Sequence, residues 1–230
     1  MKPLYKIFLL VEIQIILILL IISMFRINSI DNKVYNTNKF VHEVMVDNRK
    51  DALNTIRDTD ISIGDPEAPL TIFLYTRFDC PACNDFFLDN YNLLMTEFVN
   101  TGLVQLVIRY LVHPSKPNTL YATKSAHYLY GLGNIDLFIK RSMAIFPAID
   151  TLAIHNIVSD LTMELKEFYS IGKNKELEQN LLGLATEIRN ANVLYMPTVI
   201  INGQQLIGNR RYEKLKEIII NSLGDNYRES

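Results

Sequence analysis

Apolar residues follow two different spacings along this chain, and the change between them marks its most informative stretch. Thr71–Thr76 is a continuous, mostly apolar run of strand length, whereas Phe86–Phe98 has apolar residues at three- and four-residue spacing with acidic residues between them. We therefore expect a buried strand followed by a helix. Cys80-Pro81-Ala82-Cys83 lies between the two, so Cys80 is predicted at or near the helix N-cap, where Pro81 suits the first turn.

The rest of the chain shows the same two periodicities. Ile61–Pro69 is predicted as a turn-rich approach to the first strand. The other expected elements are a strand at Leu103–Val112, helices at Leu120–Tyr130, Ile135–Phe146, Thr151–Tyr169 and Lys175–Asn190, strands at Thr198–Ile201 and Gln205–Ile207 around an Asn202-Gly203 hairpin, and a closing helix at Arg210–Leu223. Because one helix separates the first two strands, a crossover connection that makes them parallel is expected.

The first apolar run, Ile7–Phe25, resembles a membrane-spanning helix in length and hydropathy. At about 1.5 Å rise per residue, about 19 residues nearly span a hydrocarbon core of about 30 Å. Lys2 and Lys6 precede the run, and no small-residue cleavage site follows it. We therefore expect an uncleaved signal anchor with a cytoplasmic N-terminus, and prefer it to the alternative of a buried core helix.

These patterns divide the chain into three parts. Residues 1–27 are predicted as the cytoplasmic tip and transmembrane anchor, and residues 28–60 as a polar juxtamembrane spacer. Residues 61–226 are predicted as one domain with a helical insert at roughly 115–190. The expected location is the cytoplasmic membrane, crossed once, with the domain on the periplasmic or extracellular side, where disulfides persist.

Composition narrows the possible functions. The formal net charge is -2, so the chain has no basic excess that would favour nucleic-acid binding. Its only two cysteines are Cys80 and Cys83. Two cysteines suit a redox pair or half of a metal site, but structural zinc usually has four ligands. A copper(I) site with two thiolates is a further alternative that no Met- or His-rich stretch supports. We expect neither a metal nor another cofactor.

The position of the two cysteines predicts different roles for them. A thiolate is the reactive form of cysteine, and the N–H groups and positive dipole end of a helix stabilise a negative charge. Cys80 should therefore ionise readily, whereas Cys83, one turn further along the helix, should be more buried. One cysteine can attack and the other resolve, as thiol–disulfide exchange requires.

The order of these elements is that of a thioredoxin fold, and the helical block between its halves resembles the DsbA-like branch of that family. The matching stretches are GDPEAPLTIF before the cysteines, FDCPAC at them and MPTVIING…LIG near the end, and they extend from Ile61 to about Asn221. The resemblance implies an α/β fold, with a central mixed sheet flanked by helices and interrupted by a helical insertion.

The resemblance also implies a substrate-binding segment beside the cysteines. Pro197 matches a proline that is cis and faces the C-x-x-C motif in this family. The backbone of Met196 would pair with an extended substrate, and Thr198 would begin the strand that follows. The alternative is an ordinary trans proline at the start of a strand.

Two departures from the family pattern affect the expected chemistry. A buried acidic residue often lies six positions before the first cysteine in such proteins, and here that position is Leu74. Pro81 and Ala82, the supporting dipeptide, include no imidazole to hold the thiolate, so a less oxidising disulfide is expected. Arg77 could compensate if its guanidinium reaches the sulfur.

Our leading hypothesis is a thiol:disulfide oxidoreductase that promotes disulfide formation in exported proteins, with Cys80 as nucleophile and Cys83 as resolving cysteine. Its expected partners are exported proteins with thiols or disulfides and a DsbB-like or equivalent membrane partner that reoxidises the dithiol. Two alternatives remain open. One is a thioredoxin-like disulfide reductase outside the cytoplasm, and the other is a redox-inert adaptor that binds extended peptides.

Overall fold

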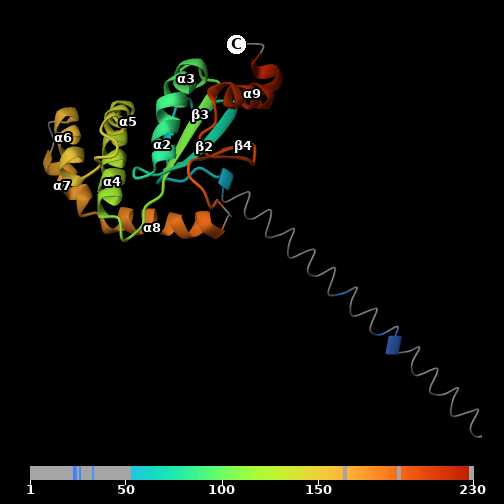
Figure 1. Cartoon of the computed structure of the whole chain (residues 1–230), viewed down its shortest axis with the longest axis horizontal. Helices are drawn as coiled ribbons and strands as arrows, with labels where there is room; N and C mark the ends of the chain where they lie inside the picture. Colours follow the sequence, from blue (N-terminus) through green and yellow to red (C-terminus); the bar gives the residue numbers. More distant parts are fainter. Residues whose placement is uncertain are drawn as a thin grey trace, which may run out of the picture. The chain divides into compact units, whose positions relative to one another are not determined.

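The computed structural model (Figure 1) describes residues 23, 24, 26 and 33, and residues 53–162, 165–190 and 193–227. Contacts divide the chain into two units, Met1–Asn48 and Arg49–Ser230, and the fold below is that of the second unit. No helix within the described residues is long and apolar enough to cross a membrane. The expected anchor, Ile7–Phe25, lies outside those residues except for Ser23 and Met24.

A mixed five-stranded sheet in the order β1-β3-β2-β4-β5 forms the centre of the unit. Its strands are β1 (Ile61–Ile63), β2 (Leu70–Thr76), β3 (Val104–Tyr110), β4 (Thr198–Ile201) and β5 (Gln204–Ile207). The central strands β2 and β3 are parallel, as expected, while β1, β4 and β5 pair antiparallel with their neighbours. This arrangement places β2, which leads into the cysteines, in the middle of the sheet.

The helices pack on both faces of this sheet (Figure 1). They are α2 (Pro81–Phe86), the π-helical η1 (Phe87–Tyr91), α3 (Asn92–Leu94), the π-helical η2 (Met95–Val99), α4 (Pro117–Gly131), α5 (Ile135–Ala144), α6 (Thr151–Leu161), α7 (Leu165–Gly172), α8 (Lys175–Asn190), α9 (Tyr212–Leu223) and the 3₁₀-helical η3 (Gly224–Tyr227). Helices α4 to α8 lie between β3 and β4 in the chain, so the expected helical insertion is confirmed.

Two differences from the expected elements have local causes. The segment expected to be turn-rich contains β1, whose three residues pair with β3 but are too few to show a strand periodicity. The single helix expected at Thr151–Tyr169 is two helices, because Thr162 has an extended backbone with φ −147° and ψ 145°. The predicted hairpin is confirmed, since Asn202 and Gly203 both have positive φ, as a type I′ turn requires.

A smaller core covers the sheet face that α8 contacts. There the side chains of Phe73, Tyr75 and Ile200 pack with residues of α8 and with Leu53. The described end of the expected spacer, residues 53–60, therefore contacts the domain, and Leu53 is buried.

A buried ion pair lies in this smaller core. The Arg109 guanidinium donates to Asp60 at 2.9 and 2.7 Å and to the Tyr75 hydroxyl at 2.6 Å, and it lies over the Phe73 ring. Arg109 also donates to the carbonyl oxygens of Leu53 and Thr55. These bonds attach the segment that leads into β1 to the central strands.

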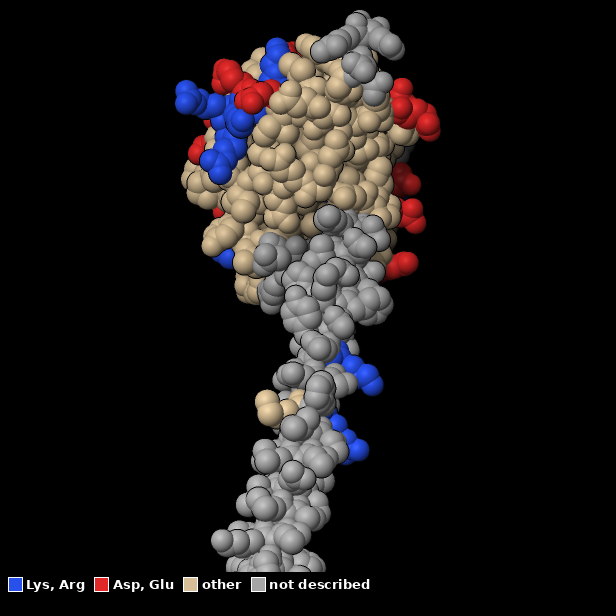
Figure 2. Space-filling model, turned by 90° about the vertical axis from the view of Figure 1, so that its right-hand side faces the viewer, with Lys and Arg blue, Asp and Glu red and all other residues tan. Residues whose placement is uncertain are grey.

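The view in Figure 2 shows the surface on the side of α9 and β4. Charged side chains of both signs gather at its margins, and uncharged atoms cover the described part of the centre. Ion pairs join opposite charges on α9 and near it, including Lys216 with Glu97 and Lys214 with Glu217. The described residues on this face therefore form no continuous basic area.

Candidate active site

Cys80 lies where the chain passes from the central strand to a helix. It is the N-cap of α2, with φ −111° and ψ 114°, and Pro81 occupies the first helical turn, as predicted. The backbone N–H of Cys83 donates to the Cys80 sulfur at 3.2 Å. A negative charge on this sulfur would be stabilised by that N–H group and by the dipole of the helical run that follows.

The two cysteines form a disulfide, and they differ in exposure. Cys83 is only 1% exposed, whereas Cys80 is partly exposed. The burial expected for Cys83 is therefore confirmed. An incoming thiolate can reach the Cys80 sulfur more easily than the Cys83 sulfur, which agrees with the roles predicted for them.

The segment before β4 lies against the exposed sulfur. The Met196–Pro197 peptide bond is cis, in agreement with the expectation from the family pattern. The Cys80 sulfur is 3.7 Å from the Met196 carbonyl oxygen, although the two residues are 116 positions apart in the chain. In the disulfide this sulfur carries no proton, so the contact can become a hydrogen bond only when Cys80 is a thiol.

Thr198 stabilises the segment before β4 through a side-chain hydrogen bond. Its side chain is buried, and its hydroxyl donates to the Tyr195 carbonyl oxygen at 2.7 Å. The backbone N–H of Gly208 donates to the Pro197 carbonyl oxygen at 2.7 Å, which joins the segment to the β5 end of the hairpin. The substrate-binding residues predicted from sequence therefore form one hydrogen-bonded segment beside Cys80.

The charged residues before Cys80 pair with one another. The Arg77 guanidinium donates twice to the Asp79 carboxylate, at 2.8 Å each time, and Lys116 lies 3.7 Å from the same carboxylate. Arg77 is therefore held by Asp79, and the compensating contact with sulfur that the sequence suggested is not among its described bonds. Leu74, at the position of the family's acidic residue, is fully buried in β2.

Aromatic side chains hold the loop between β2 and Cys80 in place. The Phe78 ring stacks on Tyr110 with ring centres 4.3 Å apart and meets Phe138 of the helical insertion edge-on. Burial raises the pKa of Tyr110, so its hydroxyl stays neutral and adds no charge to this aromatic packing. This packing fixes the loop through apolar contact.

The histidines among the described residues lie at the edge of this site or away from it. The Nδ1 atom of His113 accepts the backbone N–H of Ser115 at 3.2 Å and lies 2.8 Å from the Ser115 hydroxyl oxygen. His127 and His155 belong to α4 and α6. Within the described residues, no three His, Cys, Asp or Glu side chains are grouped as a metal site.

Sequence reasoning missed two exposed neighbours of Met196. Leu194 is 60% exposed and Tyr195 is 63% exposed, and both precede the cis bond. The sequence signal that could have identified them is their position, because both are large apolar residues directly before the Met-Pro-Thr motif. Periodicity could not identify them, because they belong to neither a helix nor a strand.

Comparison with known proteins identifies a protein family and several solved structures that this chain is similar to. The thioredoxin family model matches residues 57–221. No curated protein matches the chain. Three similar solved structures belong to Wolbachia pipientis and Bacillus subtilis, and all have sequence identities low enough to show likeness of fold alone.

Wolbachia pipientis alpha-DsbA1 is 16% identical, with a TM-score of 0.66, and the match covers 78% of this chain and 98% of that one. For alpha-DsbA2 of the same organism, described as a thiol-disulfide exchange protein, the identity is 17%, the TM-score 0.65 and the coverages 80% and 97%. Oxidised BdbD from Bacillus subtilis is 16% identical, with a TM-score of 0.60, and the match covers 72% of this chain and 93% of that one.

Proposed function

Because the chain belongs to the thioredoxin family and has a DsbA-like thiol:disulfide oxidoreductase fold with a Cys80–Cys83 pair, we propose that it promotes disulfide formation in exported proteins. We further propose that residues 7–25 anchor it in the cytoplasmic membrane with the domain outside. The observation that carries the proposal is the arrangement at Cys80. A partly exposed sulfur at a helix N-cap lies beside a carbonyl group that an extended peptide can approach.

The exchange proceeds in two steps that use the two sulfurs differently. A substrate thiolate attacks the Cys80 sulfur, the Cys80–Cys83 bond breaks, and Cys83 leaves as a thiolate that takes up a proton. A second substrate thiolate then attacks the substrate sulfur of the mixed disulfide. Cys80 leaves as a thiolate, stabilised by the N–H of Cys83. The substrate loses two electrons, and the enzyme gains them as a dithiol.

The enzyme then needs an oxidant to act again. We propose that a membrane protein of the DsbB-like type, or an equivalent thiol-oxidising partner, removes the two electrons. This step uses the same sulfur, because Cys83 is buried and Cys80 is the one within reach of a partner. We propose that solvent near the partly exposed Cys80 supplies and accepts the protons, because the buried Leu74 occupies the position of the family's acidic residue.

Two variants of the full-length chain in detergent test the exchange itself. Cys80→Ser should abolish oxidation of a reduced two-cysteine peptide, because no sulfur remains for the first attack. Cys83→Ser should instead accumulate mixed disulfides when it is mixed with the oxidised form of the peptide, as measured by mass spectrometry. The Cys80 thiolate attacks the peptide disulfide, and the Cys83 thiol that would resolve the product is absent. Full activity of Cys80→Ser would show that the redox pair has no such role.

The reduction potential of the full-length chain, measured against glutathione, decides the direction. We expect a value above the roughly −270 mV of thioredoxin and below the roughly −120 mV of DsbA, since Ala82 supplies no imidazole. A value near that of thioredoxin would favour a reductase. A disulfide that does not equilibrate with glutathione would favour the redox-inert adaptor.

A further inference from the structure

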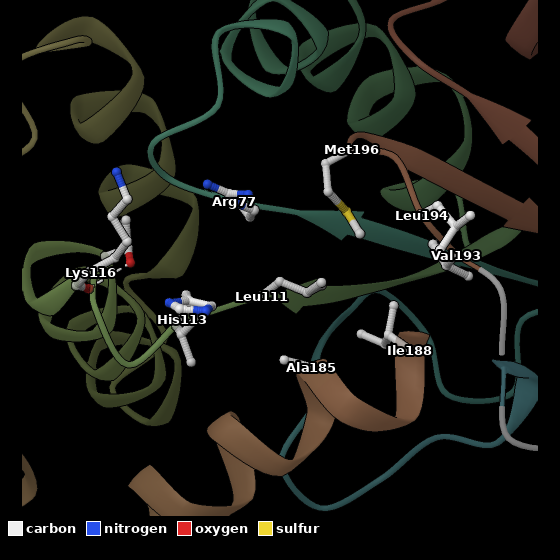
Figure 3. A pocket seen from close by; sticks show the side chains of 11 residues that line it. Arg77, Leu111, His113, Lys116, Ala185, Ile188, Val193, Leu194 and Met196 are labelled. Atoms are coloured by element: carbon white, nitrogen blue, oxygen red, sulfur yellow. Dashed lines mark hydrogen bonds between the residues drawn. The ribbon is translucent and has the colours of Figure 1, made fainter. Parts of the chain in front are cut away.

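A pocket next to Met196 has no role in the exchange described so far. Its volume is about 220 Å³, below the roughly 300–1,000 Å³ of small-molecule sites. Leu111 after β3, Ala185 and Ile188 of α8, and Met196 contribute to its wall, and their side chains converge on one space (Figure 3). A cavity of this size and lining suits a single large apolar side chain.

The rim of this Met196 pocket carries positive charge. Arg77 and Lys116 line it together with His113, and no acidic residue is among the described residues of the lining. Asp79 lies nearby and pairs with both cations, at 2.7 Å from Arg77 and 3.7 Å from Lys116. Among the described residues, one carboxylate pairs with two cations at this rim and leaves one positive charge in excess, and both cations keep contact with solvent. The rim therefore favours a carboxylate.

Met196 connects the pocket with the exchanging sulfur. Its carbonyl oxygen is 3.7 Å from the Cys80 sulfur, while its side chain forms part of the pocket wall. An extended peptide paired with this backbone would present successive side chains on opposite sides. A side chain near the reacting cysteine of such a peptide would therefore meet the pocket, and exposed Leu194 adds apolar surface at its edge.

We propose that the Met196 pocket selects substrates. It binds a bulky apolar side chain of the substrate peptide, and Arg77 and Lys116 contact the carboxylate of an adjacent acidic residue. The preferred substrates are thus exported proteins with an acidic–apolar pair close to the cysteine that attacks Cys80. This inference rests on the proposed exchange at Cys80 and names the peptides that the same site prefers.

The first test compares short two-cysteine peptides oxidised by the full-length chain in detergent. Each peptide has a pair of residues next to one of its cysteines, either before it or after it. The pair is leucine and aspartate, leucine and lysine, or serine and aspartate. The leucine–aspartate peptide should be oxidised about tenfold faster than the serine–aspartate peptide, because a leucine side chain is buried. It should be oxidised about threefold faster than the leucine–lysine peptide, because the charges at the rim are exposed.

Two variants with matched controls localise the preference. Ala185→Phe fills the pocket and should remove the preference for leucine, whereas Thr186→Phe, at the next and exposed position of α8, should keep it. Lys116→Glu should reverse the preference for aspartate, whereas Lys140→Glu on α5 should not. Because Lys116 is on the surface, its variant remains informative if Ala185→Phe does not fold.

Oxidation of dithiothreitol tests the exchange at Cys80 separately from the selectivity of the Met196 pocket, because this dithiol has no side chain that could enter the pocket. The two control variants, Thr186→Phe and Lys140→Glu, should oxidise it at the rate of the unchanged chain. Equal rates for all peptides with normal dithiothreitol oxidation would overturn the pocket proposal and leave the proposed function intact. No oxidation of dithiothreitol by the unchanged chain would overturn the proposed function.

Discussion

Arg109 shows at the scale of one residue how a charge is kept inside this domain. Its guanidinium side chain is 0% exposed, and its partner Asp60 is 1% exposed. The Phe73 and Tyr75 rings lie 4.8 and 5.4 Å from its central carbon. Burial raises the pKa of Tyr75, so its hydroxyl stays neutral and accepts from Arg109. The buried guanidinium charge is tolerated because a carboxylate, a hydroxyl group and two aromatic rings contact it.

Removing the Arg109 guanidinium should destabilise the domain strongly. In a chain without residues 1–27, Arg109→Leu should lower the free energy of unfolding by about 3–5 kcal/mol, because Asp60 stays buried without its partner. Urea denaturation measures the change. Arg141→Leu breaks an exposed pair with Asp160 and should change the free energy by less than about 1 kcal/mol. Equal effects of the two variants would contradict the argument.

His127 gives the stability of the domain a dependence on pH. Burial lowers its pKa from 6.5 to about 4, and the negative charge of Asp60 offsets only part of that effect. Between pH 6.5 and pH 4 the unfolded chain binds a proton that the folded chain does not. The free energy of unfolding contributed by this group is therefore complete above pH 6.5 and is lost as the pH falls.

We expect this loss to be about 2 kcal/mol, because the ring keeps some contact with solvent. Urea denaturation of the chain without residues 1–27 across that pH range measures it. His127→Phe should flatten this part of the pH profile, because the variant has no imidazole to protonate at this position. An unaltered profile for His127→Phe would assign the pH dependence to other groups.

At the scale of elements, the turn from β1 toward β2 depends on a glycine. Gly64 has φ +103°, and a Cβ added there would lie 2.8 Å from the Val104 carbonyl oxygen and 2.8 Å from a methyl carbon of Val99. Only glycine combines this backbone conformation with such close approach. The turn lets β1 pair with β3 at the edge of the sheet.

Gly64→Ala should therefore lower the free energy of unfolding by about 2–4 kcal/mol, from unfavourable φ and from overlap with β3. Gly131 at the end of α4 is the matched control, because a Cβ added there would meet no heavy atom within 4 Å and its φ is not positive. Gly131→Ala should raise the free energy by up to about 1 kcal/mol. Thermal unfolding compares the two, and similar melting temperatures would refute the close contact at Gly64.

Elements with a strong local signal could be predicted from sequence, and elements set by distant contacts could not. The strand Thr198–Ile201 and the helix Lys175–Asn190 have the predicted bounds, because periodicity and turn residues define them. The β1 strand exists through its pairing with β3, and the Met196 pocket arises where α8 meets the segment before β4. Sequence reasoning identified the cysteines and Pro197, whose residue types form a motif, but not Ala185 or Ile188.

At the scale of the whole molecule, residues from distant parts of the chain assemble the candidate site. Cys80 follows β2, Met196 precedes β4, and the helical insertion between them supplies α8. The same insertion closes the core through Phe138, which meets the Phe78 ring. The proposed exchange, peptide binding and selectivity therefore all depend on how the insertion packs against the sheet.

The proposed anchor adds a further property of the whole chain. Deleting residues 1–27 should move the protein from the membrane fraction to the soluble fraction, because the apolar run Ile7–Phe25 is removed. Its rate of dithiothreitol oxidation should stay within about twofold, because that reaction depends on the second unit. Fractionation and a thiol assay measure both properties. A full-length chain found mainly in the soluble fraction would contradict the anchor.

The bonds around Arg109 also give this domain a mechanical property. A pulling force applied to the chain before Leu53 would act first on the carbonyl groups of Leu53 and Thr55, which Arg109 holds, and on the Asp60 pair. These bonds resist the pull together, and they are shielded from water by Phe73 and Tyr75. The load would therefore pass into the central strand β3 before the short edge strand β1 could peel away.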